Sequence, residues 1–113
     1  MKVCQIMICK GFGGAERAFV DSCSALLDRG HDVLAIIDQG SSSEFILQQN
    51  NVPFTIINLW FRQNPLAKRA LIKTLIKFDP DIVHIHLRRS MDFAGRIAQK
   101  NNTPVVASIH NYS

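Results

Sequence analysis

The residues Val3 to Arg17 read VCQIMICKGFGGAER, and the architecture of the chain can be worked out from them. The first part, Val3 to Cys9, is dense in apolar residues, which predicts a strand buried on both faces. Three glycines follow, and from Gly14 to Arg29 apolar side chains recur at helical spacing. The stretch therefore predicts a buried strand, a glycine-containing turn and a helix.

The same alternation of strand and helix continues to the end of the chain. We expect further strands at Asp32–Asp38, Phe54–Asn58, Ile82–Leu87 and Val105–Ile109. Capping and breaking residues predict the helices Ser41–Gln49, Pro65–Phe78 and Met91–Lys100. The expected fold class is α/β, a doubly wound Rossmann-like parallel sheet of about five strands in the order 3-2-1-4-5.

Composition narrows the class of protein. The length of 113 residues fits one domain, and 47% hydrophobic with 19% charged residues is ordinary for a globular protein. The net charge of +4 is not gathered in a block, so we expect no nucleic-acid partner. Three cysteines without a C-x-x-C spacing predict small buried residues in a reducing compartment. With no signal-peptide pattern and no long apolar run, the expected location is the cytoplasm.

The strand order also predicts where a ligand binds. Ligands of such sheets lie at the carboxyl ends of the strands, where the strand order reverses. The segments 10–14, 87–90 and 110–113 should meet there, which makes His86, Arg88 and Asn111 candidate cleft or acceptor-side residues.

Gly13 and Gly14 are the candidate ligands of a diphosphate. Glycines let backbone N–H groups approach an anion, and the helix N-terminus adds its positive end. The alternative is a tight turn without a ligand.

A nicotinamide dinucleotide is a weaker candidate. The G-x-G-x-x-G pattern fits Gly11 and Gly13 but fails at Glu16, whose carboxylate disfavours a nearby pyrophosphate. Asp38, at the end of the second strand, keeps an NAD(P)-binding oxidoreductase open as an alternative. We interpret Asp38 as a surface or acceptor-side acid.

Two histidines, His84 and His86, share one face of a strand. They could ligate zinc, but no third ligand is placed by the sequence, so we expect hydrogen-bonding roles and no metal site. His86 lies nearer the carboxyl end and is the better cleft candidate.

Three segments together resemble one family. They are GGAER at 13–17, DPDIVHIH at 79–86 and TPVVASIHN at 103–111. In this order and spacing they are similar to the N-terminal half of the group-1 glycosyltransferases, family 4 in sequence classifications, which have the GT-B fold. The resemblance covers essentially the whole chain.

The resemblance implies a function and site residues. Such enzymes move a sugar from a nucleotide-sugar donor to an acceptor, here a lipid- or polysaccharide-linked glycan, with retention of configuration and without a metal or other cofactor. Gly13 and Gly14 would meet the donor diphosphate, and His110 would be the catalytic residue near the transferred sugar. Residues 1–113 would then be a truncated acceptor-side domain without its C-terminal donor-binding domain, and we expect it to be inactive alone. A stand-alone anion- or nucleotide-binding module is the non-enzymatic alternative.

The helix at 65–78 carries one further candidate surface. Arg69, Lys73 and Lys77 recur at i, i+4 and i+8 and form a basic row. We expect Leu71, Leu75 and Phe78 to face the sheet, and Ile72 and Ile76 to lie outside that inner face and flank the basic row. A basic, partly apolar face is typical of contact with a membrane surface. The alternative is an ordinary solvated helix.

Overall fold

A computed structural model describes residues 1–7, 14–38, 43–57, 65–86 and 104–108. These residues form an α/β domain with the elements β1 (Lys2–Met7), α1 (Gly14–Asp28), β2 (Asp32–Asp38), α2 (Ser43–Gln49), β3 (Phe54–Ile57), α3 (Pro65–Phe78), β4 (Ile82–His86) and β5 (Val105–Ser108). The predicted helix at 91–100 and the ends of several predicted segments lie outside the described residues.

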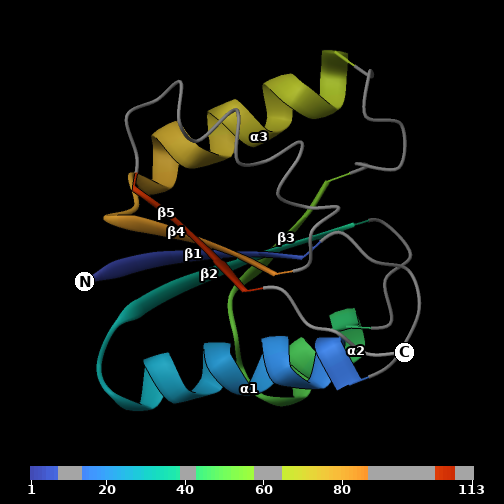
Figure 1. Ribbon diagram of the computed structural model, residues 1–113. Coiled ribbons are helices and arrows are strands. Elements are labelled where there is room, and N and C mark those ends of the chain that lie inside the picture. The colour runs from blue at the N-terminus through green and yellow to red at the C-terminus, as the bar shows by residue number, and fades with distance from the viewer. Residues whose placement is uncertain (8–13, 39–42, 58–64, 87–103, 109–113) are drawn as a thin grey trace.

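The described strands form one parallel sheet of five, in the order β3-β2-β1-β4-β5. The predicted fold class and strand order are therefore confirmed. Figure 1 shows α3 on one face of the sheet and α1 with α2 on the other, which is the doubly wound arrangement. Because both faces are covered, most strand residues on either face are apolar, and the strands do not alternate between an apolar and a polar face.

Two apolar clusters fill the space between the sheet and its two helix layers. On the α3 side the buried residues are Cys4, Ile6, Ile36, Ile57, Ala67, Leu71, Leu75, Val83 and Ile85. On the α1 and α2 side they are Met7, Phe19, Val20, Cys23, Val33, Ala35, Ile37, Leu47 and Val52. Successive residues of β1 and β2 alternate between these clusters, as the pleat of a strand requires.

The end of α1 is set by Gly30. Its φ is 87°, in the left-handed region that glycine enters without steric cost. The N–H of His31 donates to the carbonyl of Leu26, and the N–H of Gly30 donates to that of Leu27, which is the Schellman pattern. The helix was predicted to reach Arg29 and ends one residue earlier, because Arg29 already belongs to this turn.

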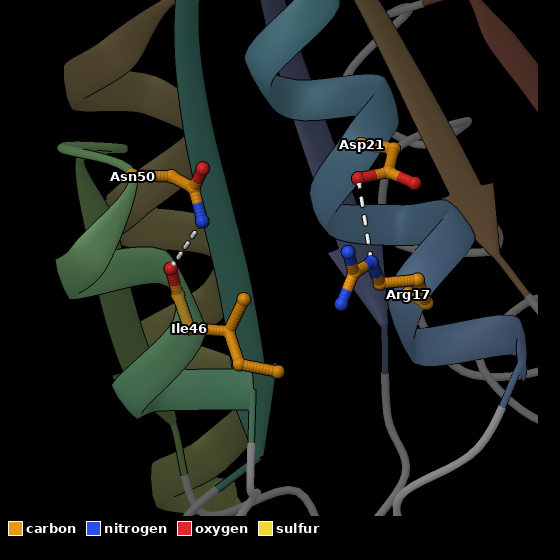
Figure 2. A network of polar contacts seen from close by, with 4 residues as sticks. All are labelled: Arg17, Asp21, Ile46 and Asn50. Carbon is orange, nitrogen blue, oxygen red and sulfur yellow. Dashed lines mark hydrogen bonds and ion pairs between the residues drawn. The ribbon is translucent and has the colours of Figure 1, made fainter.

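α2 ends in the same type of turn, formed here by asparagines instead of glycine. Asn51 has a φ of 56°, and the N–H of Val52 donates to the carbonyl of Leu47. The side-chain nitrogen Nδ2 of Asn50 donates to the carbonyl of Ile46 at 2.8 Å, as Figure 2 shows. The predicted stop at these two asparagines is confirmed and has a physical cause, since asparagine tolerates the left-handed conformation.

α3 has the predicted bounds and ends by a simpler turn. Asp79 has a φ of 51°, and its N–H donates to the carbonyl of Leu75. Pro80 follows and has no N–H, so it cannot supply the second bond that closes α1 and α2. Within the part of the chain that the structure describes, no helix is both long and apolar enough to cross a membrane.

Candidate functional site

The candidate site lies where the parallel strands end. Met7, the last residue of β1, pairs with His86, the last residue of β4, and His86 pairs with Ser108, the last residue of β5. Three strands therefore end side by side at the carboxyl edge of the sheet. The crevice at this edge is where doubly wound sheets bind their ligands.

The segments that follow these strand ends carry most of the predicted site. Gly13 lies between β1 and α1, Arg88 comes after β4, and His110 and Asn111 come after β5. All four residues lie outside the described residues, so their predicted roles stay predictions.

Gly14 is the first residue of α1. The first N–H groups of a helix lack intrahelical acceptors, and the helix dipole gives this end a partial positive charge. Figure 1 shows α1 running back beneath the sheet from the side where β1 ends. Phe19 and Cys23 are fully buried against the sheet and hold the helix in that position. The N-terminus of α1 therefore lies toward the carboxyl edge of the sheet.

Arg17 and Asp21 lie one turn apart on the outer face of α1, as Figure 2 shows. The Nε atom of Arg17 is 3.8 Å from a carboxylate oxygen of Asp21, and both side chains are 70% exposed. Such an exposed pair contributes little to stability. Arg17 is the last residue of the GGAER segment at 13–17, and its side chain points to solvent rather than into the core.

A buried polar chain connects α1 with β1 and β4. Gln5 is fully buried in the middle strand, and its Nε2 donates to the Oγ of Ser22 on α1 at 3.1 Å. Its Oε1 lies 2.6 Å from the Nε2 of His86. Since an amide oxygen can only accept, His86 must donate from Nε2, and the contact fixes the position of that proton.

His86 is packed as well as hydrogen bonded. Its ring meets Phe19 edge to face, with centroids 5.1 Å apart, and lies 4.2 Å from the ring of the half-buried His84. Its exposed fraction is 2%. In this structure the ring anchors the end of β4 beneath α1, and its predicted contact with an acceptor stays a prediction.

Gln5 was not singled out by the sequence analysis. The signal that could have found it is a lone amide among the apolar residues of the strand VCQIM, because a buried polar group needs a partner. The partner itself, 81 residues away, follows only from the pairing of β1 with β4.

Asp38 ends β2 at the same edge of the sheet. We interpreted it as a surface or acceptor-side acid, and the surface part is wrong because its exposed fraction is 1%. The reason is its position: it pairs with Ile57 of β3, and the preceding Ile37 pairs with Met7 of β1. Its side chain lies on the same face of β2 as Ile36, which is buried in the cluster beneath α3.

The cysteines are buried thiols, as predicted for Cys4 and Cys23; Cys9 lies outside the described residues. Burial and, to a smaller extent, the neighbouring Cys23 together raise the pKa of Cys4 from 9.0 to about 12. Burial also raises the pKa of Cys23 to about 12, against a backbone hydrogen bond that lowers it. Both are therefore protonated near neutral pH and inert as nucleophiles. The described residues hold no group of three or more metal-ligand side chains.

The predicted basic row lies on the outer face of α3. Leu71 and Leu75 face the sheet and are buried, which confirms the predicted inner face. Ile72 was predicted to lie outside that face, but it is half-buried and packs against the core. We define the outer stripe as the exposed residues of α3 that follow the basic row at helical spacing: Leu66, Arg69, Lys73, Ile76 and Lys77.

Solved structures show the same fold. A glycosyltransferase from Rickettsia africae aligns over 99% of this chain with a TM-score of 0.77 and 20% identity. MurG from Acinetobacter baumannii aligns over 95% with a TM-score of 0.76 and 18% identity. HepE from Anabaena, solved with UDP and glucose, aligns over 95% with a TM-score of 0.76 and 15% identity. The fold is that of one domain of a GT-B glycosyltransferase.

The sequence places the chain in a family. The model of the family described as Glycosyltransferase Family 4 matches residues 12–113, and the chain belongs to that family. This supports a glycosyltransferase rather than an oxidoreductase. No curated protein sequence matches. The chain spans 29% to 34% of the length of the three solved structures.

Proposed function

We propose that this chain is the N-terminal, acceptor-side domain of a retaining glycosyltransferase that works together with a C-terminal donor-binding domain. The observation that carries the proposal is the match to Glycosyltransferase Family 4 over residues 12–113. The fold agrees with it, because the sheet and helix layers are those of one GT-B domain. This chain aligns with about a third of each of those chains, which supports a second domain that supplies the rest of the active site.

The donor is a nucleotide sugar whose diphosphate meets the start of α1. HepE from Anabaena is solved with UDP-glucose, which supports this class of donor. The N–H groups around Gly13 and Gly14 would bind the phosphate oxygens through charge-assisted hydrogen bonds, worth ~1.5–3 kcal/mol each. No metal is needed for this contact, because the helix N-terminus itself offsets the negative charge.

The acceptor is a lipid- or polysaccharide-linked glycan held at the same edge by His86, Arg88 and Asn111. A neutral imidazole at His110 would hydrogen bond the transferred sugar or stabilise charge developing on the leaving diphosphate. This activity belongs to the synthesis of envelope polysaccharide at the cytoplasmic side of a membrane.

The two roles can be separated in the protein that carries both domains. Gly14→Val places a side chain between the helix N-terminus and the phosphate, so nucleoside-diphosphate affinity should fall at least tenfold in calorimetry. His110→Ala should lower turnover while affinity changes little, because its contact favours the transition state. Ala25→Val, an exposed position in the same helix, is the matched control and should change neither. Wild-type affinity and turnover in Gly14→Val would show that the glycines form only a turn.

The outer stripe of α3 is proposed to contact an anionic membrane surface. α3 contains four basic residues and no acidic one, and Leu66 and Ile76 are 70% and 66% exposed within the stripe. Each basic residue near the surface contributes ~1 kcal/mol, screened by salt.

Vesicle binding tests this contact. Arg69→Gln should weaken co-sedimentation with phosphatidylserine vesicles at low salt about fivefold. Lys68→Gln, which removes the same charge outside the stripe, is the control. Equal binding to neutral vesicles, or equal effects of both variants, would leave α3 an ordinary solvated helix.

A further inference from the structure

A hollow lies between the second half of α3 and the strands β2 and β3. It is lined by Leu34 of β2, Thr55 of β3, and Lys73, Thr74, Lys77 and Phe78 of α3, and its volume is about 510 Å³. Small-molecule sites occupy roughly 300–1,000 Å³. The hollow is therefore large enough for a small ligand, and three separate elements form it.

The hollow is remote from the carboxyl edge. Leu34 is the third residue of β2 and Thr55 the second of β3, so both lie in the amino-terminal halves of their strands. Phe78 is the last residue of α3, and the hydrogen bond from the Nζ of Lys2 to its carbonyl, 3.2 Å long, holds this helix end at the start of β1. The hollow is thus distinct from the proposed glycosyl-transfer site.

The described charged residues that line the hollow are all basic. Lys73 and Lys77 are one helical turn apart and exposed, and like charges at this spacing repel each other. A third cation is near, because the Nζ of Lys2 lies 5.6 Å from the centre of the Phe78 ring. Among the described residues that line the hollow, none is acidic. An anion between the two lysines would relieve their repulsion.

The walls add an apolar component. Leu34 and Phe78 are both half-buried, so each offers part of an apolar side chain to the hollow. The Oγ of Thr74 donates to the carbonyl of Ala70 at 2.8 Å and so retains only its acceptor capacity, which an anion does not use. Recognition of an anion therefore depends on the two lysines, and the remaining surface suits an alkyl group.

We propose that this hollow binds a single-chain alkyl phosphate, with the phosphate between Lys73 and Lys77 and the chain against Leu34 and Phe78. The site does not depend on glycosyl transfer. The hollow shares Lys73 and Lys77 with the outer stripe. The hollow binds one molecule, whereas the stripe contacts a membrane surface.

Calorimetry with octyl phosphate, below the concentration at which it forms micelles, tests the proposal. The expected result is saturable binding of one molecule. Lys73→Gln with Lys77→Gln should weaken it at least tenfold. Lys68→Gln with Arg69→Gln removes two charges from the same helix outside the hollow and should change affinity less than twofold. Thr55→Glu, which puts a carboxylate into the hollow from another element, should also weaken binding at least tenfold.

Two further ligands separate the components of the site. Inorganic phosphate and octanol should each bind at least tenfold more weakly than octyl phosphate. Equal binding of inorganic phosphate would mean a simple anion site, and equal binding of octanol would mean an apolar hollow; either result overturns the proposal. It is likewise overturned if octyl phosphate does not saturate, or if both double variants lose affinity equally. Loss of vesicle binding in Arg69→Gln with octyl phosphate affinity retained separates this site from the membrane contact.

Discussion

Replacing Gln5 by methionine should destabilise the domain through the buried polar chain. Methionine has nearly the length and volume of glutamine, so the packing of β1 is retained while the amide is lost. The Nε2 of His86 then loses the acceptor at 2.6 Å, and the Oγ of Ser22 loses the donor at 3.1 Å. The variant therefore removes hydrogen bonding from a residue that is fully buried.

The magnitude follows from the burial of the partners. Removing the partner of a buried polar group costs ~1–3 kcal/mol, and the 2% exposure of His86 leaves water little access to replace the acceptor. Ser22 is half-buried, so water can hydrogen bond its hydroxyl, and the loss of its donor contributes less to the fall in the free energy of unfolding. With a urea m-value of ~1–3 kcal/mol per molar, the unfolding midpoint should fall by on the order of 1 M.

A double variant tests the cause. His86→Phe keeps an aromatic ring against Phe19, whose centroid is 5.1 Å away, but removes the donor that Gln5 accepts from. Gln5→Met with His86→Phe should cost less than the sum of the single variants, because no half of the pair is left buried alone. Gln48→Met, at an exposed position of α2, is the control and should stay within ~0.5 kcal/mol of wild type. The reasoning would be refuted if the losses of unfolding free energy in the two single variants added up in the double variant. It would also be refuted if Gln5→Met lost less than ~0.5 kcal/mol.

The remaining predictions concern the turn, the core and the thiols. Gly30→Ala should cost ~1 kcal/mol in urea unfolding from backbone strain alone, since φ is +87° and no described atom lies within 4 Å of the added Cβ; an unchanged midpoint would contradict this. Leu71→Ala should cost ~2–5 kcal/mol, and Ile76→Ala on the exposed face below ~0.5; similar costs would mean that α3 packs differently. Burial raises the pKa of Cys4 and Cys23 from 9.0 to about 12, so the unfolded chain loses thiol protons first. Stability should therefore fall between pH 9 and 12 by up to ~1.4 kcal/mol per pH unit for each thiol, and replacing both by alanine should flatten that slope.

The sequence predicted the features that local chemistry determines. β2 and α3 have the predicted bounds because residues with special backbone properties lie next to them. Gly30 adopts the left-handed conformation before β2, and Pro80, which has no N–H, follows α3. The strand order followed because right-handed crossovers leave few arrangements of five alternating units. These inferences needed no knowledge of which side chains meet.

The candidate site was less predictable because it depends on contacts between distant segments. The pairing of Gln5 with His86 needs β1 beside β4 in one register, and a shift of one residue would turn one of the two side chains to the other face. Asp38 looks like a surface acid in the sequence, yet it is 1% exposed, because it ends a strand inside the sheet on the face that α3 covers. Gly13, Arg88 and Asn111 were chosen from the glycine chemistry and the predicted strand order, and the catalytic role of His110 from the family resemblance. All four residues lie outside the described part of the chain, so their roles stay predictions.

The most direct test of the proposed function is glycosyl transfer measured with and without the donor domain. A protein that carries this domain together with its donor-binding partner is offered a panel of nucleotide sugars and glycan acceptors. We predict transfer with retained anomeric configuration, observed by NMR of the product, and no turnover by residues 1–113 alone. Holding donor and acceptor in line can contribute ~7–11 kcal/mol to lowering the barrier, and one wall of a cleft cannot do so. Failure of the two-domain protein to consume any nucleotide sugar, or robust transfer by residues 1–113 alone, would contradict the account.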